Sequence, residues 1–171
     1  MKIRLTGKAV PAINPGVVNA LRSIDNPLRI LFVCLANLCR SPMAEAMAKH
    51  LHGRDLAPDS AGVSPAPGPM LPEAVRVIKK ITGFDFSGHV PRFVLDLPVQ
   101  DFDYIIALDS SVFLRLNDMP QIPKDRLYGW DIVDPCGLGE DAYERTAAQI
   151  EEDLERFLLN REMEKSAPRR R

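Results

Sequence analysis

Cysteine and long apolar runs are scarce in this sequence. The 171 residues include three cysteines, and a small, odd number argues against the disulfide framework of a secreted domain. No apolar run approaches the ~20 residues of a membrane-spanning helix. The basic N-terminus also lacks a continuous apolar core of signal-peptide length. We therefore expect a cytoplasmic protein with reduced thiols and no membrane partner.

A strong charge of either sign is missing too, as are the common metal and nucleotide motifs. The net charge is -1, which predicts no nucleic-acid partner. There is no CxxC pair and no HExxH motif, and His50 and His52, two apart on a predicted helix, would not face one another. No Gly-x4-Gly-Lys-Ser/Thr motif for a nucleoside triphosphate occurs. We predict no metal and no cofactor.

What is present has the pattern of one globular domain. Hydrophobic residues make up 46% and charged residues 26% of the chain, an ordinary balance for a single domain. Apolar periodicity, turn residues and caps predict strands over 30–33, 56–61, 104–108 and 127–130, and helices over 42–51, 72–81 and 141–159, with one more helix capped by Asp109-Ser110. This alternation indicates an α/β fold with a parallel sheet and right-handed crossovers.

The domain itself is placed at residues 28–162. Residues 1–27 form an N-terminal extension in which Asn14-Pro15 suits the start of a short helix. Residues 163–171 are expected to be a disordered basic tail, because Ser166 to Arg171 include no core-forming side chain.

The most informative stretch is the predicted loop between the first strand and the first helix, within RILFVCLANLCRSPMAEAM. A strand, a tight loop and a helix N-terminus form the geometry in which several backbone N–H groups converge on one anion. The loop begins after Cys34 and ends at Arg40. We predict that it binds a phosphate group, with the binding residues Leu35, Ala36, Asn37, Leu38, Cys39 and Arg40.

Cys34 and Arg40 suit nucleophilic chemistry on that phosphate. Helix N-termini and nearby cations lower the pKa of a thiol from its usual ~8.5. The planar guanidinium of arginine can hold two phosphate oxygens at once. A thiolate beneath a bound phosphate is placed for in-line attack, which gives a phosphocysteine intermediate.

Asp134 is the predicted proton donor to the leaving group. Pro135 disfavours helical geometry for the preceding residue and should hold it extended. The loop follows the fourth strand, so it lies at the same sheet edge as Cys34. A carboxyl whose pKa is raised by a nearby anion can donate a proton to a departing phenolate. Asp131, three residues earlier, is the alternative acid.

These motifs resemble those of the low-molecular-weight protein tyrosine phosphatases, including bacterial members. VCLANLCRSP is similar to the signature loop of that family, and Asp134-Pro135 is similar to its acid loop. Weaker landmarks follow in the same order: Asp59-Ser60-Ala61-Gly62, Gly83, Ser87-Gly88-His89, Arg92, and Phe102-Asp103 through Asp109. The resemblance spans roughly residues 28–159.

The resemblance implies a four-stranded parallel sheet of order 2-1-3-4 flanked by helices, and hydrolysis of phosphotyrosine in proteins without a metal. It implies that Cys34 is the nucleophile, Arg40 the phosphate clamp and Asp134 the acid, which then acts as base for the hydrolytic water. It also implies a hydrogen-bond network that shapes the loop and holds the thiolate, formed by Asn37, Ser41 and Ser60. We expect a monomer or a weak dimer.

Two positions depart from the family pattern. Ala36 stands where most members carry glycine, and it fits without strain only if its φ is negative. Most tyrosine-directed members have an aromatic residue after Asp-Pro that walls the substrate ring, whereas this chain has Cys136 and Gly137. Three aromatic residues could replace that wall, namely Tyr128, Trp130 and Tyr143.

Cys39 and Cys136 are the candidate redox partners of Cys34. In many relatives a thiol at the position of Cys39 forms a disulfide with the nucleophile and protects it from over-oxidation. The alternative is that Cys39 is a small buried thiol packed under the loop. Cys136, close to the predicted acid, is the second candidate.

Three other functions compete with phosphotyrosine hydrolysis. A thiol-dependent arsenate reductase uses a similar loop but needs further thiols, typically a cysteine pair after the second helix, and residues 70–100 contain none. Phosphoarginine phosphatases of this family carry a small polar residue where Leu38 stands, so Leu38 favours an aryl phosphate. A phosphoprotein-binding pseudo-phosphatase would lack the Cys, the Arg or the Asp, and all three are present.

Overall fold

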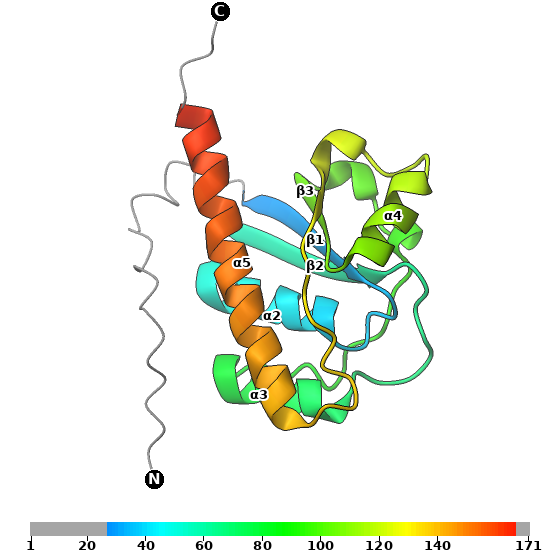
Figure 1. The fold of residues 1–171 in the computed structure, drawn as a ribbon, viewed down its shortest axis with the longest axis vertical. Coiled ribbons are helices and arrows are strands. Elements are labelled where there is room, and N and C mark those ends of the chain that lie inside the picture. The colour runs from blue at the N-terminus through cyan, green and yellow to red at the C-terminus, as the bar shows by residue number, and fades with distance from the viewer. Residues whose placement is uncertain (1–26, 167–171) are drawn as a thin grey trace, which may run out of the picture.

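The computed structural model describes residues 27–166 (Figure 1). The predicted N-terminal extension, apart from its last residue, and residues 167–171 of the predicted tail lie outside the described part. The strands are β1 (Leu28–Cys34), β2 (Leu56–Gly62), β3 (Tyr104–Ala107) and β4 (Leu127–Gly129). They form one parallel sheet in the order β2-β1-β3-β4, which confirms the predicted fold class and strand order.

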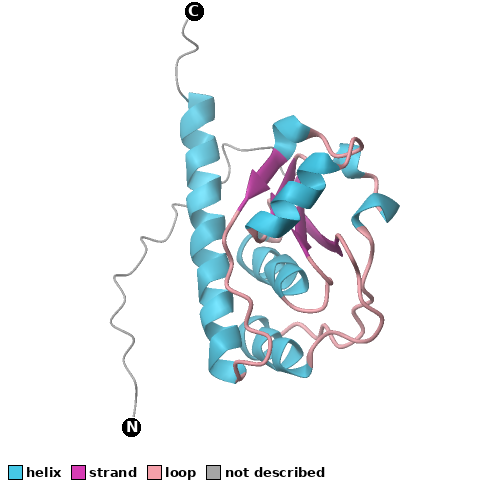
Figure 2. Ribbon diagram, turned by 45° about the vertical axis from the view of Figure 1, so that its right-hand side comes forward, coloured by secondary structure: helices cyan, strands magenta, loops and turns pink. Residues whose placement is uncertain are grey.

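Four α-helices cover the two faces of this sheet (Figure 2). They are α2 (Arg40–His52), α3 (Pro72–Thr82), α4 (Ser110–Asp118) and α5 (Glu140–Ser166). Helices α2, α3 and α5 contact one another on one side, whereas α4 contacts β3 and β4 on the other. In Figure 1, α5 runs along the whole height of the domain.

Strand β1 is the centre of the core because both of its faces are covered. Ile30, Leu31, Phe32 and Val33 are all fully buried, as expected for a central strand of a parallel sheet. Since side chains alternate along a strand, Phe32 packs in the cluster under α2 and α5 and Val33 in the cluster under α4. The register pairs Cys34 with Gly62, so the predicted nucleophile lies at the carboxyl end of the sheet.

Most element boundaries differ from the predicted ones by one or a few residues. Helix α2 begins at Arg40, two residues before the predicted start, so that arginine belongs to the first helical turn. The stretch before β3 contains two 3-10 turns, Val94–Asp96 and Val99–Asp101. Helix α5 continues to Ser166, past the predicted domain end at residue 162. The predicted cap is confirmed, because Asp109 accepts a hydrogen bond from the N–H of Val112.

None of the helices within 27–166 has the length and apolar character to cross a bilayer. The same residues contain no group of three or more His, Cys, Asp or Glu side chains placed to hold a metal ion.

Candidate active site

The loop after β1 is braced from outside through its carbonyl groups. Four backbone N–H groups from residues 63–71 donate to the carbonyl oxygens of Cys34, Leu35, Ala36 and Leu38, at 2.9–3.3 Å. Across a planar trans peptide, the C=O of one residue and the N–H of the next point in opposite directions. Carbonyls drawn outward therefore leave the following N–H groups facing into the loop, which is the arrangement an anion needs.

Three polar side chains meet around the sulfur of Cys34, which is buried. Its Sγ lies 3.0 Å from Ser41 Oγ and accepts the N–H of Asn37 at 3.3 Å. The Asn37 amide nitrogen donates to Ser41 Oγ at 2.9 Å and to Ser60 Oγ at 3.1 Å. The structure thus brings the three predicted supporting residues together at the thiol. The Asn37 N–H, a donor directed at the sulfur, stabilises negative charge on it.

The backbone of the loop turns at Asn37. Among residues 27–166 it is the one non-glycine residue with positive φ, at 56°. Asparagine tolerates this left-handed region better than most residues because its short side chain bonds locally. Ala36 does not have positive φ, so the replacement of glycine at that position introduces no strain of this kind.

The guanidinium of Arg40 is buried and contacts two carboxylates. Nη1 lies 3.0 Å from Asp109 Oδ2 and donates to the carbonyl of Ile132 at 3.1 Å, while Nη2 donates to Asp134 Oδ2 at 3.1 Å. The predicted clamp and the predicted acid, far apart in the sequence, are therefore in contact. Asp131, the alternative acid, is not among the partners of Arg40 within the described part of the chain.

Asp109 has a second role that its cap motif did not reveal. One carboxylate oxygen caps α4 and accepts from Ser111 Oγ, and the other faces Arg40. Burial by itself would raise the pKa of Asp109, but these hydrogen bonds and the guanidinium outweigh it and hold the pKa below its ordinary value. Asp109 therefore stays ionised and orients the arginine.

Asp134 lies on a more open segment. Its side chain is 53% exposed, and its Oδ1 accepts the N–H of Cys136 at 3.1 Å. Pro135 is buried, whereas Cys136 and Gly137 are exposed. The carboxyl is therefore anchored by its proline and by Arg40 while remaining reachable from solvent.

A second group of residues supports Asn37 from the far side, and sequence reasoning assigned these residues no roles. The side-chain oxygen of Asn37 accepts the N–H of Arg92 at 2.9 Å, and His89 Nε2 lies 3.0 Å from the Asn37 carbonyl. Arg92 in turn pairs with Asp59. Burial lowers the pKa of His89, and its hydrogen bond to Asn37 opposes that shift. In the sequence, the one indication of a role was that Asp59, His89 and Arg92 all lie in the weaker family landmarks.

Ser60 reaches the network from inside β2 rather than from its end. It pairs with Phe32 in the register, two residues before the end of the strand. Its hydroxyl donates to Glu45 Oε2 of α2 at 2.7 Å, which leaves its oxygen to accept from Asn37. Burial raises the pKa of Glu45, and the hydrogen bond from Ser60 opposes that rise.

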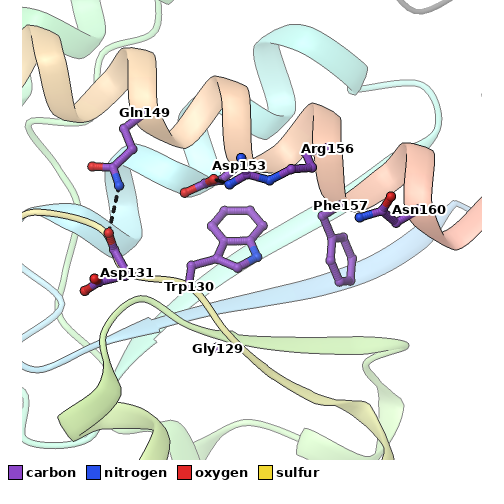
Figure 3. A pocket seen from close by; sticks show the side chains of 8 residues that line it. All are labelled: Gly129, Trp130, Asp131, Gln149, Asp153, Arg156, Phe157 and Asn160. Atoms are coloured by element: carbon purple, nitrogen blue, oxygen red, sulfur yellow. Dashed lines mark hydrogen bonds and ion pairs between the residues drawn. The ribbon is translucent and has the colours of Figure 1, made fainter.

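The three aromatic residues considered for the substrate wall are engaged elsewhere. Tyr128 and Trp130 pack on Phe157 of α5, with ring centroids 5.2 and 6.1 Å away. Tyr143 is 2% exposed, and burial raises the pKa of its hydroxyl. Trp130 instead lines a groove of about 480 Å³ between the end of β4 and α5 (Figure 3), together with Gly129, Asp131, Gln149, Asp153, Arg156, Phe157 and Asn160.

The three cysteines are all free thiols with different surroundings. Cys39 is buried at the start of α2, and its sulfur faces Met43 Sδ at 3.9 Å. Burial raises the pKa of the Cys39 thiol far above its usual value, which makes it a poor nucleophile toward an oxidised Cys34. Cys136 is exposed. Either redox pairing stays a prediction.

Gly62 is the one residue whose lack of a side chain keeps the loop in place. A Cβ at this position would lie 2.7 Å from the Leu35 carbonyl oxygen and 3.1 Å from the backbone nitrogen of Asn37. We expect Gly62→Ala to lower the free energy of unfolding by about 1–3 kcal/mol, because backbone atoms must move to admit the methyl group. Chemical denaturation measures this, and Gly88→Ala, where a Cβ meets nothing within 4 Å, is the matched control. Equal effects of the two substitutions would contradict the argument.

Comparison with known proteins places this site in context. Residues 29–169 match a family model described as low molecular weight phosphotyrosine protein phosphatase. The chain is 38% identical over 98 residues to the low molecular weight protein-tyrosine-phosphatase YfkJ of Bacillus subtilis. The aligned residues make up 54% of this chain and 63%, less than two thirds, of that relative. It is 27% identical over 131 residues to a glutaredoxin arsenate reductase of Synechocystis, covering 76% of this chain and 95% of the relative.

A solved structure agrees with the fold. The low molecular weight protein tyrosine phosphatase of T. tengcongensis superposes with a TM-score of 0.67 at 31% sequence identity. The superposition covers 81% of this chain and 99% of the other. The four-stranded sheet and its flanking helices thus belong to a known architecture.

Proposed function

Because the chain belongs to the low molecular weight phosphotyrosine protein phosphatase family, we propose that it hydrolyses phosphotyrosine in proteins through a phosphocysteine intermediate. The observation that carries this proposal is the convergence of a buried thiol, an arginine and a half-exposed carboxyl at one edge of the sheet. Arg40 links the loop of Cys34 to Asp134 at 3.1 Å, and such an arrangement has no evident use in the core packing.

In the first step Cys34 attacks the phosphorus atom of the substrate. The thiolate forms the S–P bond while the P–O bond to the tyrosine oxygen breaks. The inward N–H groups of the loop and the guanidinium of Arg40 stabilise the charge on the equatorial oxygens. Asp134 gives its proton to the leaving phenolate oxygen.

In the second step a water molecule releases the phosphate. Asp134, now ionised, takes a proton from the water, whose oxygen attacks the phosphorus and breaks the S–P bond. The products are inorganic phosphate and the Cys34 thiolate, which the N–H of Asn37 and the hydroxyl of Ser41 face. No metal enters the scheme, and the arginine provides the positive charge.

The rim of the loop supports an aromatic substrate. Leu35 is 43% exposed next to the nucleophile, and Leu38 is half-buried on the same loop. Two aliphatic side chains at this position favour contact with a phenyl ring over contact with the polar guanidino group of phosphoarginine.

Arsenate reduction is the second candidate, because the chain aligns with 95% of an arsenate reductase. Reduction of arsenate to arsenite takes two electrons, which two thiols supply by forming a disulfide. After Cys34 binds arsenate, this chain offers only the buried Cys39 and the exposed Cys136. The raised pKa of Cys39 disfavours the former, so this activity depends on Cys136 or on an external thiol.

The test is a substrate panel with a paired substitution. We expect the wild type to hydrolyse a phosphotyrosine peptide and to leave phosphoserine and phosphoarginine peptides untouched. Asp134→Asn should lower kcat for the phosphotyrosine peptide by roughly 10²–10⁴-fold, because the leaving phenolate loses its proton donor. Asp131→Asn, three residues away and not in contact with Arg40, is the matched control and should retain activity.

The outcomes separate the candidates. Loss of activity in Asp131→Asn rather than in Asp134→Asn would reassign the acid. Turnover of arsenate with a thioredoxin or glutaredoxin couple, without phosphotyrosine hydrolysis, would replace the phosphatase with a reductase. Phosphate binding without any turnover would leave a binding protein.

A further inference from the structure

The last residues before Asp134 are held by side chains of α5, and we infer that Gln149 is a positioning residue for the acid. The inference rests on the proposed function, since it assigns Gln149 a role in the protonation step. Gln149 does not touch the site of Cys34. It acts on the backbone of the segment that carries Asp134.

One amide group of Gln149 binds two positions of that segment. Its Nε2 donates to the carbonyl of Asp131 at 2.7 Å, and its Oε1 accepts the N–H of Val133 at 3.2 Å. Figure 3 shows the Gln149 side chain extending from α5 to Asp131. A carboxamide offers one acceptor and two donors, so it can pair with an extended backbone as a neighbouring strand would. Thr146 adds a donor from the same helix, its hydroxyl bonding the Val133 carbonyl at 3.2 Å.

The other side of the segment is bonded to the end of β3. Trp130 donates its N–H to Ala107 O at 2.8 Å, and Ile132 donates to Leu108 O at 2.9 Å. In an extended chain, the backbone groups of successive residues point to opposite sides. The even-numbered residues therefore pair with the sheet, and residues 131 and 133 face α5. Gln149 and Thr146 fill the place of the missing outer strand, because β4 is the edge of the sheet.

The segment becomes freer immediately after this double attachment. Asp134 has one ion pair with Arg40 and one local hydrogen bond. Gly137 and Gly139, both with positive φ, follow on an exposed stretch. Val133 is thus the last residue before the acid whose backbone is hydrogen-bonded to α5, through its N–H to Gln149 and through its carbonyl to Thr146. A displacement of about 1 Å in a catalytic group can cost up to roughly 10²-fold in rate.

The experiment compares leaving groups. Gln149→Met keeps the length of the side chain and removes its hydrogen bonds. We expect kcat/KM, which reports only the first step, to fall roughly 10- to 100-fold for a substrate with a basic leaving group, such as phosphotyrosine or phenyl phosphate. A nitrophenyl or dinitrophenyl phosphate, whose phenolate departs with little help from an acid, should lose less than about 3-fold. Gln149→Glu keeps the acceptor for the Val133 N–H but loses the donor to the Asp131 carbonyl. Its rate on the substrate with the basic leaving group should lie between those of the wild type and Gln149→Met.

A matched control tests whether the loss of any glutamine hydrogen bond lowers the rate in the same way. Gln100 lies before β3, at the opposite end of the strands, and donates to the Gln121 carbonyl at 2.8 Å on an exposed surface. Gln100→Met should leave both substrates unchanged. Thermal unfolding of all three variants separates a general loss of stability from a specific effect on the acid.

Amide hydrogen exchange gives a readout that does not depend on activity. The N–H of Val133 should exchange faster in Gln149→Met, while those of Trp130 and Ile132 stay protected by β3. Unchanged exchange at Val133 would overturn the inference. So would faster exchange with equal losses of kcat/KM for both leaving groups, because the loss would then not come from protonation of the leaving group. If the wild type hydrolyses no phosphate ester, the proposed function fails and this inference fails with it, whereas an active wild type with an unaltered Gln149→Met rejects the inference alone.

Discussion

Replacement of Cys34 by serine is expected to lower kcat for a phosphotyrosine peptide by roughly 10⁴-fold or more. A serine hydroxyl stays protonated near neutral pH and is a much weaker nucleophile than a cysteine thiolate. Cys34 is buried at the end of β1 and contacts Ser41 and Asn37, so it is the thiol that the proposed attack uses. Loss of a nucleophile in other enzymes has effects of up to roughly 10⁶-fold. Steady-state kinetics measures the loss.

Two controls accompany this substitution. Cys136→Ser changes an exposed thiol and should leave the rate within about 2-fold. Acid quenching of the wild type during turnover of a labelled substrate should trap phosphate on Cys34, as a covalent intermediate requires. Substantial turnover by Cys34→Ser, or label found on another residue, would show that the chemistry does not pass through this thiol.

Replacement of Arg40 by lysine should lower kcat/KM by roughly 10³-fold, even though the positive charge is kept. The guanidinium reaches Asp109 Oδ2, the Ile132 carbonyl and Asp134 Oδ2 at 3.0–3.1 Å, and such a fork can also hold two phosphate oxygens. An ammonium group is a point charge that cannot reproduce this geometry, and an arginine that stabilises a transferring phosphoryl group is worth roughly 10³–10⁵ in rate. The measurement is the full kinetic analysis of both proteins.

A structural arginine provides the comparison. Arg126 Nη1 donates to the carbonyls of Gln100 and Phe102 at 2.8 and 3.0 Å, before the amino end of β3. Arg126→Lys loses similar hydrogen bonds and should change kcat/KM by less than about 3-fold. If Arg40→Lys proves as mild as Arg126→Lys, then phosphate is held by the backbone N–H groups alone and the clamp assignment is wrong.

The alternation of strands and helices could be predicted from the sequence because it depends on local spacing. Apolar runs such as Ile30 to Val33 and the caps at Asp109 and Gly83 act over a few residues, and the helices and strands lie close to the predicted ranges. The alternation also indicated a parallel sheet, whereas the strand order 2-1-3-4 came from the resemblance to a family. The start of α2 at Arg40 was missed because Ser41-Pro42 is the stronger local signal for a helix start.

The chemistry-bearing residues were also visible in the sequence, because their motifs are short. The spacing from Cys34 to Arg40 and the Asp134-Pro135 pair are local features. The residue types at these positions, a thiol, a guanidinium and a carboxyl, limit the chemistry that the site can perform. The sequence could not select among Tyr128, Trp130 and Tyr143 as a substrate wall. Their rings are directed by packing against α5, and no local pattern encodes that packing.

The sequence by itself therefore determined the elements, the candidate nucleophile and the candidate acid, and the tertiary structure alone decided what holds them in place. Asp109 meets Arg40, Gly62 makes room for the loop, and Gln149 binds the segment before Asp134. Each of these contacts joins residues of different helices, strands or loops. Strand register and helix packing set such contacts, and both depend on the burial of the whole core rather than on the few residues around any one motif.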